Sequence, residues 1–442
     1  MRLLVRAGLV YTGERELEGG WVLAEDGLIT DVGSGPLPAA DTVIDEPNCL
    51  AMPGLVNAHD HMYQWATRGY VSDGTLFEWL RALYPVWARI DADTVRVAAR
   101  AAMARLLLSG CTLSTDHHYV FPRGASGIFE ALVETARELG LRFHPCRGSM
   151  SLGESKGGLP PDSVVEDSDA ILADTEAMIS RFHDPERGSM CRVVVAPCSP
   201  FSVTPDLMRE SASLARRHGV RLHTHVAETR DEERFCLEKF GRRPYELMED
   251  LGWTGGDVWF AHGIHFSDGE VSRVGSSHTG IAHCPSSNMR LGAGMCRVDE
   301  LVRAGARVGL GVDGAASNED SNIAFEAHQA LLLARARVES PQALDARTAL
   351  RLATAGGAAC LGRSDCGVLA PGMCADIACF RVDDLAHAGI EDLVAGVVLA
   401  PPARAETVVV NGKLVVREGR LLTADEGEIA RDLSSVSLRL AT

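Results

Sequence analysis

The segment PGLVNAHDH, residues 53–61, combines a Pro-Gly turn, a short apolar run and two histidines one residue apart, His59 and His61. Alternate residues of a strand point to the same side, so these two rings can face one point. Seven further short apolar runs follow, and amphipathic stretches such as residues 94–110 and 127–140 lie between them. Eight strands that alternate with helices pair in parallel and, at this number, close into a barrel. The fold class is therefore predicted as α/β, a (β/α)8 TIM barrel.

The junctions between the predicted helices and strands support the barrel prediction. Helical stretches end in glycine directly before the next apolar run, as in ELG-LRF (138–143) and RHG-VRL (217–222). This is the expected order of a helix C-cap and a following strand. An open, doubly wound sheet is the alternative, but no GxGxxG motif follows the first strand.

The two ends of the chain differ from the middle in their pattern of apolar and turn residues. Residues 1–53 alternate short apolar runs with Gly and Asp turns, and the same texture returns after residue 365. Asn411-Gly412 stands between two alternating segments, which is a strong hairpin signal. We expect one small β-sandwich domain built from residues 1–53 and 365–442, around a barrel of residues 54–364.

The composition of the chain limits the classes of partner that we expect it to bind. The 442 residues carry a formal net charge of -17, which disfavours nucleic-acid backbones and anionic membranes. No signal-peptide pattern and no membrane-spanning stretch is visible, and the twelve cysteines are scattered without a CxxC pair. We expect a cytoplasmic protein with reduced thiols and a small-molecule substrate. A homodimer or a higher homo-oligomer is compatible with the sequence.

Polar residues collect at the ends of successive predicted strands, which is where a parallel barrel places its active site. His59 and His61 end the first strand, His225 the fifth, His262 the sixth and Asp313 the eighth. Imidazoles and one carboxylate around a single point suit zinc or iron and leave a position open for water. The joint placement therefore predicts a mononuclear metal site.

Glu228 follows His225 by three residues, where the strand turns into its loop. A carboxylate there can reach a water at the metal without being a ligand, and its expected role is to shuttle a proton. A solvated loop glutamate is the alternative. Among the other histidines, the doublet of His117 and His118 cannot aim both rings inward, and His223 could donate a hydrogen bond to a ligand. The roles of these three residues and of His283 stay open.

With these motifs the sequence resembles the amidohydrolase superfamily over nearly its whole length. PGLVNAHDH, HTHVAE, AHG, HCPSSN and GLGVDG stand in the order typical of the branch that holds cytosine and guanine deaminases and chlorotriazine hydrolases. The resemblance implies that one divalent ion, Zn²⁺ or alternatively Fe²⁺, is bound by His59, His61, His225 and Asp313. It implies that Glu228 is the acid/base, that His262 polarises the reacting groups, and that Asp313 also accepts a proton.

HDHMYQWATRG, with Gln64 three residues after His61, resembles the purine-reading segment of guanine deaminases. Three longer segments resemble bacterial 8-oxoguanine deaminases, namely RGSMSLGESKGGLPPDSVVED, VVVAPCSPFSVTPDLMRESA and VDGAASNED. They imply conversion of 8-oxoguanine and water to urate and ammonia. Guanine or isoxanthopterin deamination, and triazine hydrolysis that releases chloride or an amine, are the alternatives. A scaffold protein without activity is a third class, but every predicted ligand and Glu228 are present. Asp60 and the segment AHGIHFS depart from the 8-oxoguanine deaminase pattern.

Specificity should rest on buried hydrogen-bonding groups, because an unmatched polar contact costs more than a misplaced methylene. Gln64 is the first candidate for reading the edge of the heterocycle. Weaker substrate-binding candidates are Arg147 and Ser149 after the third strand and Cys198 and Ser199 after the fourth. Trp65 could line the pocket or belong to the core.

Overall fold

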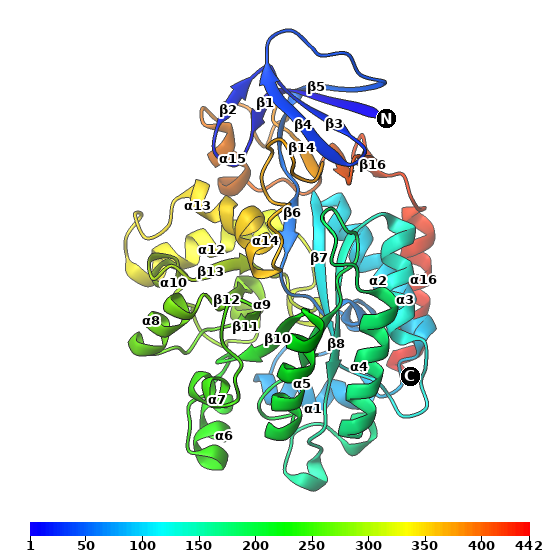
Figure 1. Cartoon of the computed structure of the whole chain (residues 1–442), viewed down its shortest axis with the longest axis vertical. Helices are drawn as coiled ribbons and strands as arrows, with labels where there is room; N and C mark the ends of the chain where they lie inside the picture. Colours follow the sequence, from blue (N-terminus) through cyan, green and yellow to red (C-terminus); the bar gives the residue numbers. More distant parts are fainter.

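The computed structural model describes residues 1–442, which form a barrel with a smaller β-domain over one of its ends (Figure 1). The barrel strands are parallel and follow the chain order around the sheet, from β6 to β13. Their bounds are β6 Leu55–Asn57, β7 Cys111–His118, β8 Arg142–Ser149, β9 Val194–Pro197, β10 Arg221–Val226, β11 Val258–His262, β12 Gly280–His283 and β13 Arg307–Leu310. The last strand meets the first where the Ala58 N–H donates to the Leu310 carbonyl at 2.8 Å. The predicted (β/α)8 barrel is confirmed.

Helices cover the outside of the barrel, as the amphipathic stretches predict. The first are α1 Leu76–Trp87, α2 Ala92–Leu108, α3 Ile128–Leu139, α4 Ser168–Phe182, α5 Pro205–His218, α6 Arg230–Phe240, α7 Pro244–Asp250 and α8 Asp268–Ser277. They are followed by α9 Pro285–Arg290, α10 Val298–Arg303, α11 Ala315–Asn318, α12 Ile323–Val338, α13 Ala346–Arg351 and α14 Gly357–Cys360. The C-cap glycines Gly140 and Gly219 adopt φ of 78° and 67°, the left-handed conformation that lets each chain turn into its next strand. No helix is long and apolar enough to cross a bilayer.

Strands from both termini form the second domain, the predicted β-sandwich. They are β1 Arg2–Tyr11, β2 Glu16–Glu18, β3 Gly20–Glu25, β4 Leu28–Ser34, β5 Thr42–Pro53, β14 Ile377–Arg381, β15 Thr407–Val410, β16 Lys413–Arg417 and β17 Arg420–Leu421. The two halves join where β14 pairs antiparallel with β5, and a bridge between Leu28 and Cys374 brings the β4 edge back to the chain before β14. Asn411 and Gly412 have φ of 50° and 72°, as the predicted hairpin turn requires.

The C-terminal helix α16, Glu426–Ala441, lies beside α2 on the barrel rather than on the sandwich (Figure 1). Its apolar face is buried against the barrel helices, and Arg439 donates to Thr94 at 2.9 Å. The predicted division assigns this helix to the sandwich because it follows the last strand in the chain. In space, this helix packs against α2 of the barrel. A short helix, α15 Leu393–Leu399, packs on α12 and α13.

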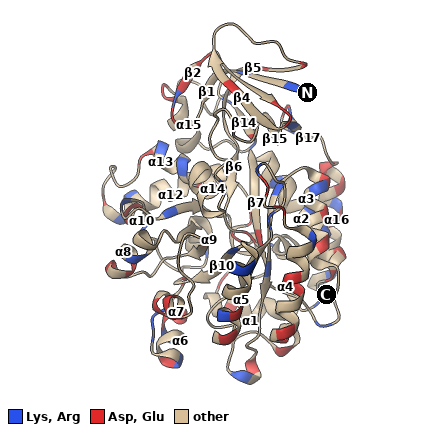
Figure 2. Cartoon of the chain, in the orientation of Figure 1, with Lys and Arg blue, Asp and Glu red and all other residues tan.

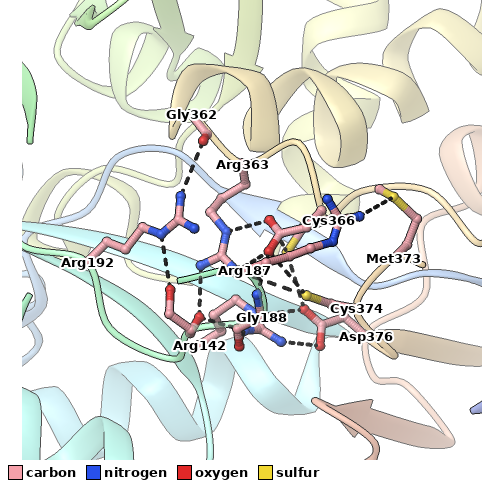
Figure 3. Close-up of polar contacts among 12 residues, drawn as sticks. Arg142, Arg187, Gly188, Arg192, Gly362, Arg363, Cys366, Met373, Cys374 and Asp376 are labelled. Carbon is pink, nitrogen blue, oxygen red and sulfur yellow. Dashed lines mark hydrogen bonds and ion pairs between the residues drawn. The ribbon is translucent and has the colours of Figure 1, made fainter. Parts of the chain in front are cut away.

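A buried polar network joins the sandwich to the N-terminal ends of the barrel strands (Figure 3). Arg142, the first residue of β8, pairs through two nitrogens with Asp376 at 2.9 and 3.0 Å. Arg363 pairs in the same way with Asp365 at 2.7 and 2.9 Å. Because both Asp365 oxygens accept from Arg363, this acid and the neighbouring thiols of Cys366 and Cys374 do not form a metal site.

All twelve cysteines are buried and none is in a disulfide, in line with the expectation of reduced thiols. Acidic and basic residues are interspersed on the outer helices in the view of Figure 2 and are sparse on the barrel strands.

Candidate metal and substrate site

The four predicted metal ligands come together at the C-terminal ends of the barrel strands. His59 and His61 follow β6, His225 belongs to β10 and Asp313 follows β13. The Nε2 atoms of His61 and His225 are 3.1 Å apart, and Asp313 Oδ1 lies 3.3 Å from His61 Nε2 and 3.4 Å from His59 Nε2. All four side chains are buried.

Hydrogen bonds on the far side of each ring assign the tautomers of His61 and His225. The Nδ1–H of His61 donates to the His117 carbonyl at 2.7 Å, and that of His225 donates to the Cys198 carbonyl at 2.7 Å. Burial lowers the pKa of His61 to about 3, so the ring is neutral. A neutral ring that donates from Nδ1 has a lone pair on Nε2.

His59 reaches the same state through a second histidine. His223 donates its Nδ1–H to the Trp259 carbonyl at 2.9 Å, so its Nε2 accepts from His59 Nδ1 at 2.8 Å. His59 Nε2 then carries a lone pair and has no hydrogen-bond partner. The role of His223, left open by the sequence, is that of an acceptor: it accepts from His59 and thereby holds that ring in place.

Three imidazole lone pairs and a carboxylate oxygen therefore face one point without a proton between them. Bare lone pairs repel at 3.1 Å, and only a cation at that point makes the arrangement favourable. Three neutral nitrogens with one carboxylate are a ligand set for zinc or ferrous iron. The residues that are present fit a divalent transition metal.

The backbone is strained at three strand ends of this site. Ala227, His262 and Asp313 have φ of 57°, 73° and 61°, a left-handed conformation that costs a side-chain-bearing residue roughly 1–2 kcal/mol. Such residues persist where the surrounding structure holds them, and they collect at functional sites. Here the turns bring Glu228, His262 and Asp313 into the barrel mouth.

Glu228 and His262 form a pair that can exchange a proton. Glu228 Oε2 lies 3.6 Å from His262 Nε2, and burial raises the pKa of Glu228 to about 7. Glu232 fixes the loop because its carboxylate accepts the N–H groups of Ala227 and Glu228 at 2.9 and 2.7 Å. Asn288 Oδ1 lies 3.0 Å from His262 Nδ1 and orients that ring. A carboxyl with a pKa near neutrality is suited to acid/base catalysis.

Asp313 is oriented from its other oxygen. Oδ2 accepts from the Ser287 hydroxyl at 2.6 Å, which leaves Oδ1 toward the histidines. The next residue is glycine, and a Cβ there would come within 1.9 Å of Gln64 Oε1 and displace that side chain. Sequence reasoning missed the roles of Glu232, Ser287 and Asn288. The polar segment PSSN, directly after the seventh strand, was the available signal for two of them.

A pocket with about 410 Å³ of empty space opens on this centre. Gln64, Cys198 and Ser199 line it, as predicted for substrate-binding residues, together with Trp79, Tyr84, Tyr119 and Phe201. Gln64 Oε1 and the Tyr84 hydroxyl are both buried without a partner. Tyr84 was not singled out from the sequence, because nothing in the amphipathic helix α1 distinguishes it from a core residue.

Two other predicted substrate-binding residues, Arg147 and Ser149, do not line the pocket. The Arg147 guanidinium binds Glu166 at 2.7 Å and Asp174 at 2.6 Å, and its Cζ lies 3.7 Å from the centre of the Phe121 ring. These partners come from the loop and helix that follow β8, and they turn the side chain away from the barrel mouth. Trp65 also lies outside the pocket lining and donates to Ser321 at 3.2 Å, so it belongs to the core.

The His117–His118 doublet divides as alternation requires. The His117 ring lies 4.7 Å from that of His225, whereas His118 packs on Tyr63 and bonds the Val120 carbonyl at 2.8 Å. His117 is therefore part of the wall behind the ligands. His283 is buried at the end of β12 and does not line the pocket.

Comparison with known proteins agrees with this geometry. The Amidohydrolase family model matches residues 50–415. The 8-oxoguanine deaminase of Pseudomonas aeruginosa is 46% identical over 98% of this chain and 97% of its own length. A hydroxydechloroatrazine ethylaminohydrolase of Pseudomonas sp. is 38% identical, with coverage of 96% and 92%.

Among solved structures, atrazine chlorohydrolase from Arthrobacter aurescens TC1, complexed with zinc, superposes with a TM-score of 0.95. It is 34% identical and the match covers 98% of this chain and 100% of that one. These matches span the barrel and most of the sandwich, and they agree with a metal-dependent hydrolase that acts on C–N bonds. The chain belongs to the amidohydrolase family.

Proposed function

We propose that the protein is a deaminase of 8-oxoguanine, which it converts with water to urate and ammonia. The observation that carries the proposal is the 46% identity, over nearly the full length of both chains, to an enzyme with that name. We further propose a single resident ion, Zn²⁺, because the two candidate ligand groups at the strand ends, His59–His61–His225 and His59–His262–Asp313, share His59 and so surround one point, and because a structural neighbour is complexed with zinc.

In this proposal His59, His61, His225 and Asp313 hold the ion. When bound, the ion supplies the Lewis acidity that makes water a nucleophile near neutral pH. Asp313 accepts the proton of the attacking water, while Ser287 keeps its carboxylate in place. Glu228 delivers a proton to the ring nitrogen beside the attacked carbon, and His262 stabilises the charge that develops there. The exocyclic C–N bond then breaks as the proton on Asp313 passes to the leaving amine, which departs as ammonia, and the new hydroxyl group returns a proton to Glu228 and becomes the product carbonyl.

The pocket lining supports a neutral, flat substrate. No lysine or arginine lines it, so a phosphorylated substrate would find no cation, whereas a free base needs none. The rings of Trp79, Tyr119 and Phe201 provide apolar walls. Burial holds the pKa of Tyr84 well above its usual range, so its hydroxyl stays a donor for a ring carbonyl. The unpartnered Gln64 Oε1 can accept from a ring N–H.

Guanine or isoxanthopterin deamination and triazine hydrolysis are the competing assignments. Among these alternatives, the structural likeness to an atrazine chlorohydrolase favours triazine hydrolysis. The two departures from the 8-oxoguanine deaminase pattern lie outside the pocket. Asp60 accepts from Asn57 at 3.0 Å, and neither Asp60 nor residues 263–267 line the cavity. Of the segment AHGIHFS, only His262 lines the pocket.

The experiment that tests the proposal is a substrate panel. The purified, metal-loaded protein is incubated with 8-oxoguanine, guanine, isoxanthopterin, cytosine and a chlorotriazine, and both ammonia and chloride are assayed. The proposal expects the highest kcat/KM for ammonia release from 8-oxoguanine, with urate as the product. Chloride from the triazine as the dominant product, or no ammonia from any purine or pterin, would show the assignment to be wrong.

A further inference from the structure

We propose a second binding site, for a phosphate group, at the N-terminal ends of the barrel strands and thus opposite the metal centre. A cavity with about 530 Å³ of empty space lies there between the starts of β9 and β10 and the chain around Gly362. Its polar lining consists of His144, His183, Arg192 and Arg221, and no carboxylate lines it. Figure 3 shows Arg192 at this edge, beside Gly362.

Neither guanidinium in the cavity has a carboxylate partner. Arg192 donates only to neutral oxygens, namely Ser189 Oγ at 3.0 Å and the carbonyls of Gly362, Pro185 and Glu186. Arg221 donates through Nε to the Cys360 carbonyl at 3.1 Å, and its Nη2 is buried without any partner. Both guanidinium groups are thus partly withdrawn from water with no carboxylate at hydrogen-bond distance, and an anion between them would offset that cost.

His144 supplies the second, independent observation. Its side chain is 1% exposed, it lines the cavity, and neither ring nitrogen has a hydrogen-bond partner. Buried polar groups in folded proteins are nearly always bonded, so an imidazole left open toward a cavity indicates a missing ligand. Whichever tautomer it adopts, a neutral imidazole can donate one N–H to an anion.

The neighbouring arginines show that the open pair is an exception. Arg142 and Arg363 are fully engaged by Asp376 and Asp365 in the network of Figure 3. Asp257 near Arg221 is already bound by Arg216 at 2.9 Å. Exposed Asp184 acts on Arg192 from outside the cavity, and the lining itself holds two arginines and no acid.

Two guanidinium groups and an imidazole around a small cavity match a dianionic oxyanion, since arginine forks bind phosphate oxygens in pairs. A divalent cation is excluded by the same charges. The phosphate could be free or could be the phosphoryl group of a larger molecule.

Isothermal titration of the metal-loaded protein tests the proposal. Inorganic phosphate and a nucleoside monophosphate are titrated in separate runs, with chloride used to match the ionic strength. We expect saturable binding of one phosphate per chain. Tighter binding of the nucleotide would identify a phosphoryl group as the ligand, and equal or weaker binding would identify the free ion.

Variants locate the site. Arg192→Met and Arg221→Met should each weaken binding about 10-fold or more, because each removes a charge-assisted contact. The matched control is Arg217→Met, which removes an exposed arginine from the end of the neighbouring helix α5 and should leave binding unchanged. If Arg221→Met fails to fold, Arg192→Met alone decides. The proposal is overturned if wild-type protein binds neither probe, or if Arg192→Met binds phosphate as tightly as wild type does.

Discussion

At the C-terminal ends of the barrel strands, three imidazole lone pairs and a carboxylate face one another, whereas at the N-terminal ends guanidinium groups face carboxylates. His61 and His225 are 3.1 Å apart with no proton between their Nε2 atoms, but Arg142 holds Asp376 through two hydrogen bonds. Both clusters are buried. One is complete only with a ligand, and the other is complete within the chain.

This difference indicates that the two ends of the barrel have different roles. At the metal end, His262 and Asp313 adopt a strained, left-handed backbone. The opposite end ties the sandwich to the barrel through paired charges (Figure 3). In barrels of this type, function resides at the C-terminal face and stability at the other. Substitutions at the two ends should therefore fail in different assays.

The largest effect is expected at the metal end. Glu228→Gln keeps the shape of the side chain but removes its titrating oxygen, so kcat should fall about 10³- to 10⁴-fold. Metal content, measured by mass spectrometry, should stay near that of wild type, because Glu228 is not one of the proposed ligands. Loss of the metal in this variant would instead identify Glu228 as a ligand.

The other end should respond in stability. Arg142→Met leaves Asp376 buried without its partner, and the free energy of unfolding should drop by about 3–5 kcal/mol. Denaturant titration measures this, with Arg381→Met as control. Arg381 forms an exposed pair with Asp383, and its loss should cost less than about 1 kcal/mol. Equal losses in the two variants would contradict the structural role of the buried pair.

The carboxyl group of Asp116 lies near the metal end and has no cationic partner. Its titration should distinguish the two ends of the barrel through the pH dependence of stability. Asp116 accepts the Met62 N–H at 2.9 Å with one oxygen, its other oxygen has no partner, and burial raises the pKa of Asp116 from 3.8 to about 7. The folded state binds this proton more tightly than the unfolded chain does. Its contribution to stability is therefore full below the unfolded pKa and is lost as the pH rises through about 7.

Asp116→Asn removes that titration. Relative to the variant, wild type should lose about 2–3 kcal/mol of unfolding free energy between about pH 5 and about pH 8. Denaturant titrations of both proteins at the two pH values give the difference. Asp206→Asn, at an exposed ion pair with Arg209, should keep the wild-type pH dependence. A parallel pH dependence in wild type and Asp116→Asn would count against a raised pKa at this residue.

The smallest effect is expected at the pocket wall. Tyr84→Phe removes one unpartnered hydroxyl, so kcat/KM should fall about 10-fold while metal content and stability stay unchanged. Tyr245→Phe is the control, since its hydroxyl contacts Ser277 at 3.4 Å, away from the pocket. Steady-state kinetics that are unaffected by Tyr84→Phe would mean that this hydroxyl does not meet the substrate.

The sequence by itself determined the barrel, the two-ended sandwich and the grouping of His59, His61, His225 and Asp313. These follow from strand alternation, helix period and the rule that parallel strands point their C-terminal ends to one face. Glu228 and Gln64 were also within reach, because each lies three residues after a predicted ligand. Such regularities are local or topological, and they need no knowledge of which distant segments meet.

Only the tertiary structure decided the partners that come from elsewhere in the chain. Arg147 lies near the end of the third barrel strand, where a pocket residue is expected, but its guanidinium binds Glu166 and Asp174 instead. Tyr84 reaches the pocket because α1 folds over the barrel mouth, and α16 leaves the sandwich for α2. Whether a buried polar group is paired depends on which side chains folding brings into contact, and the spacing of residues along the sequence does not specify those contacts.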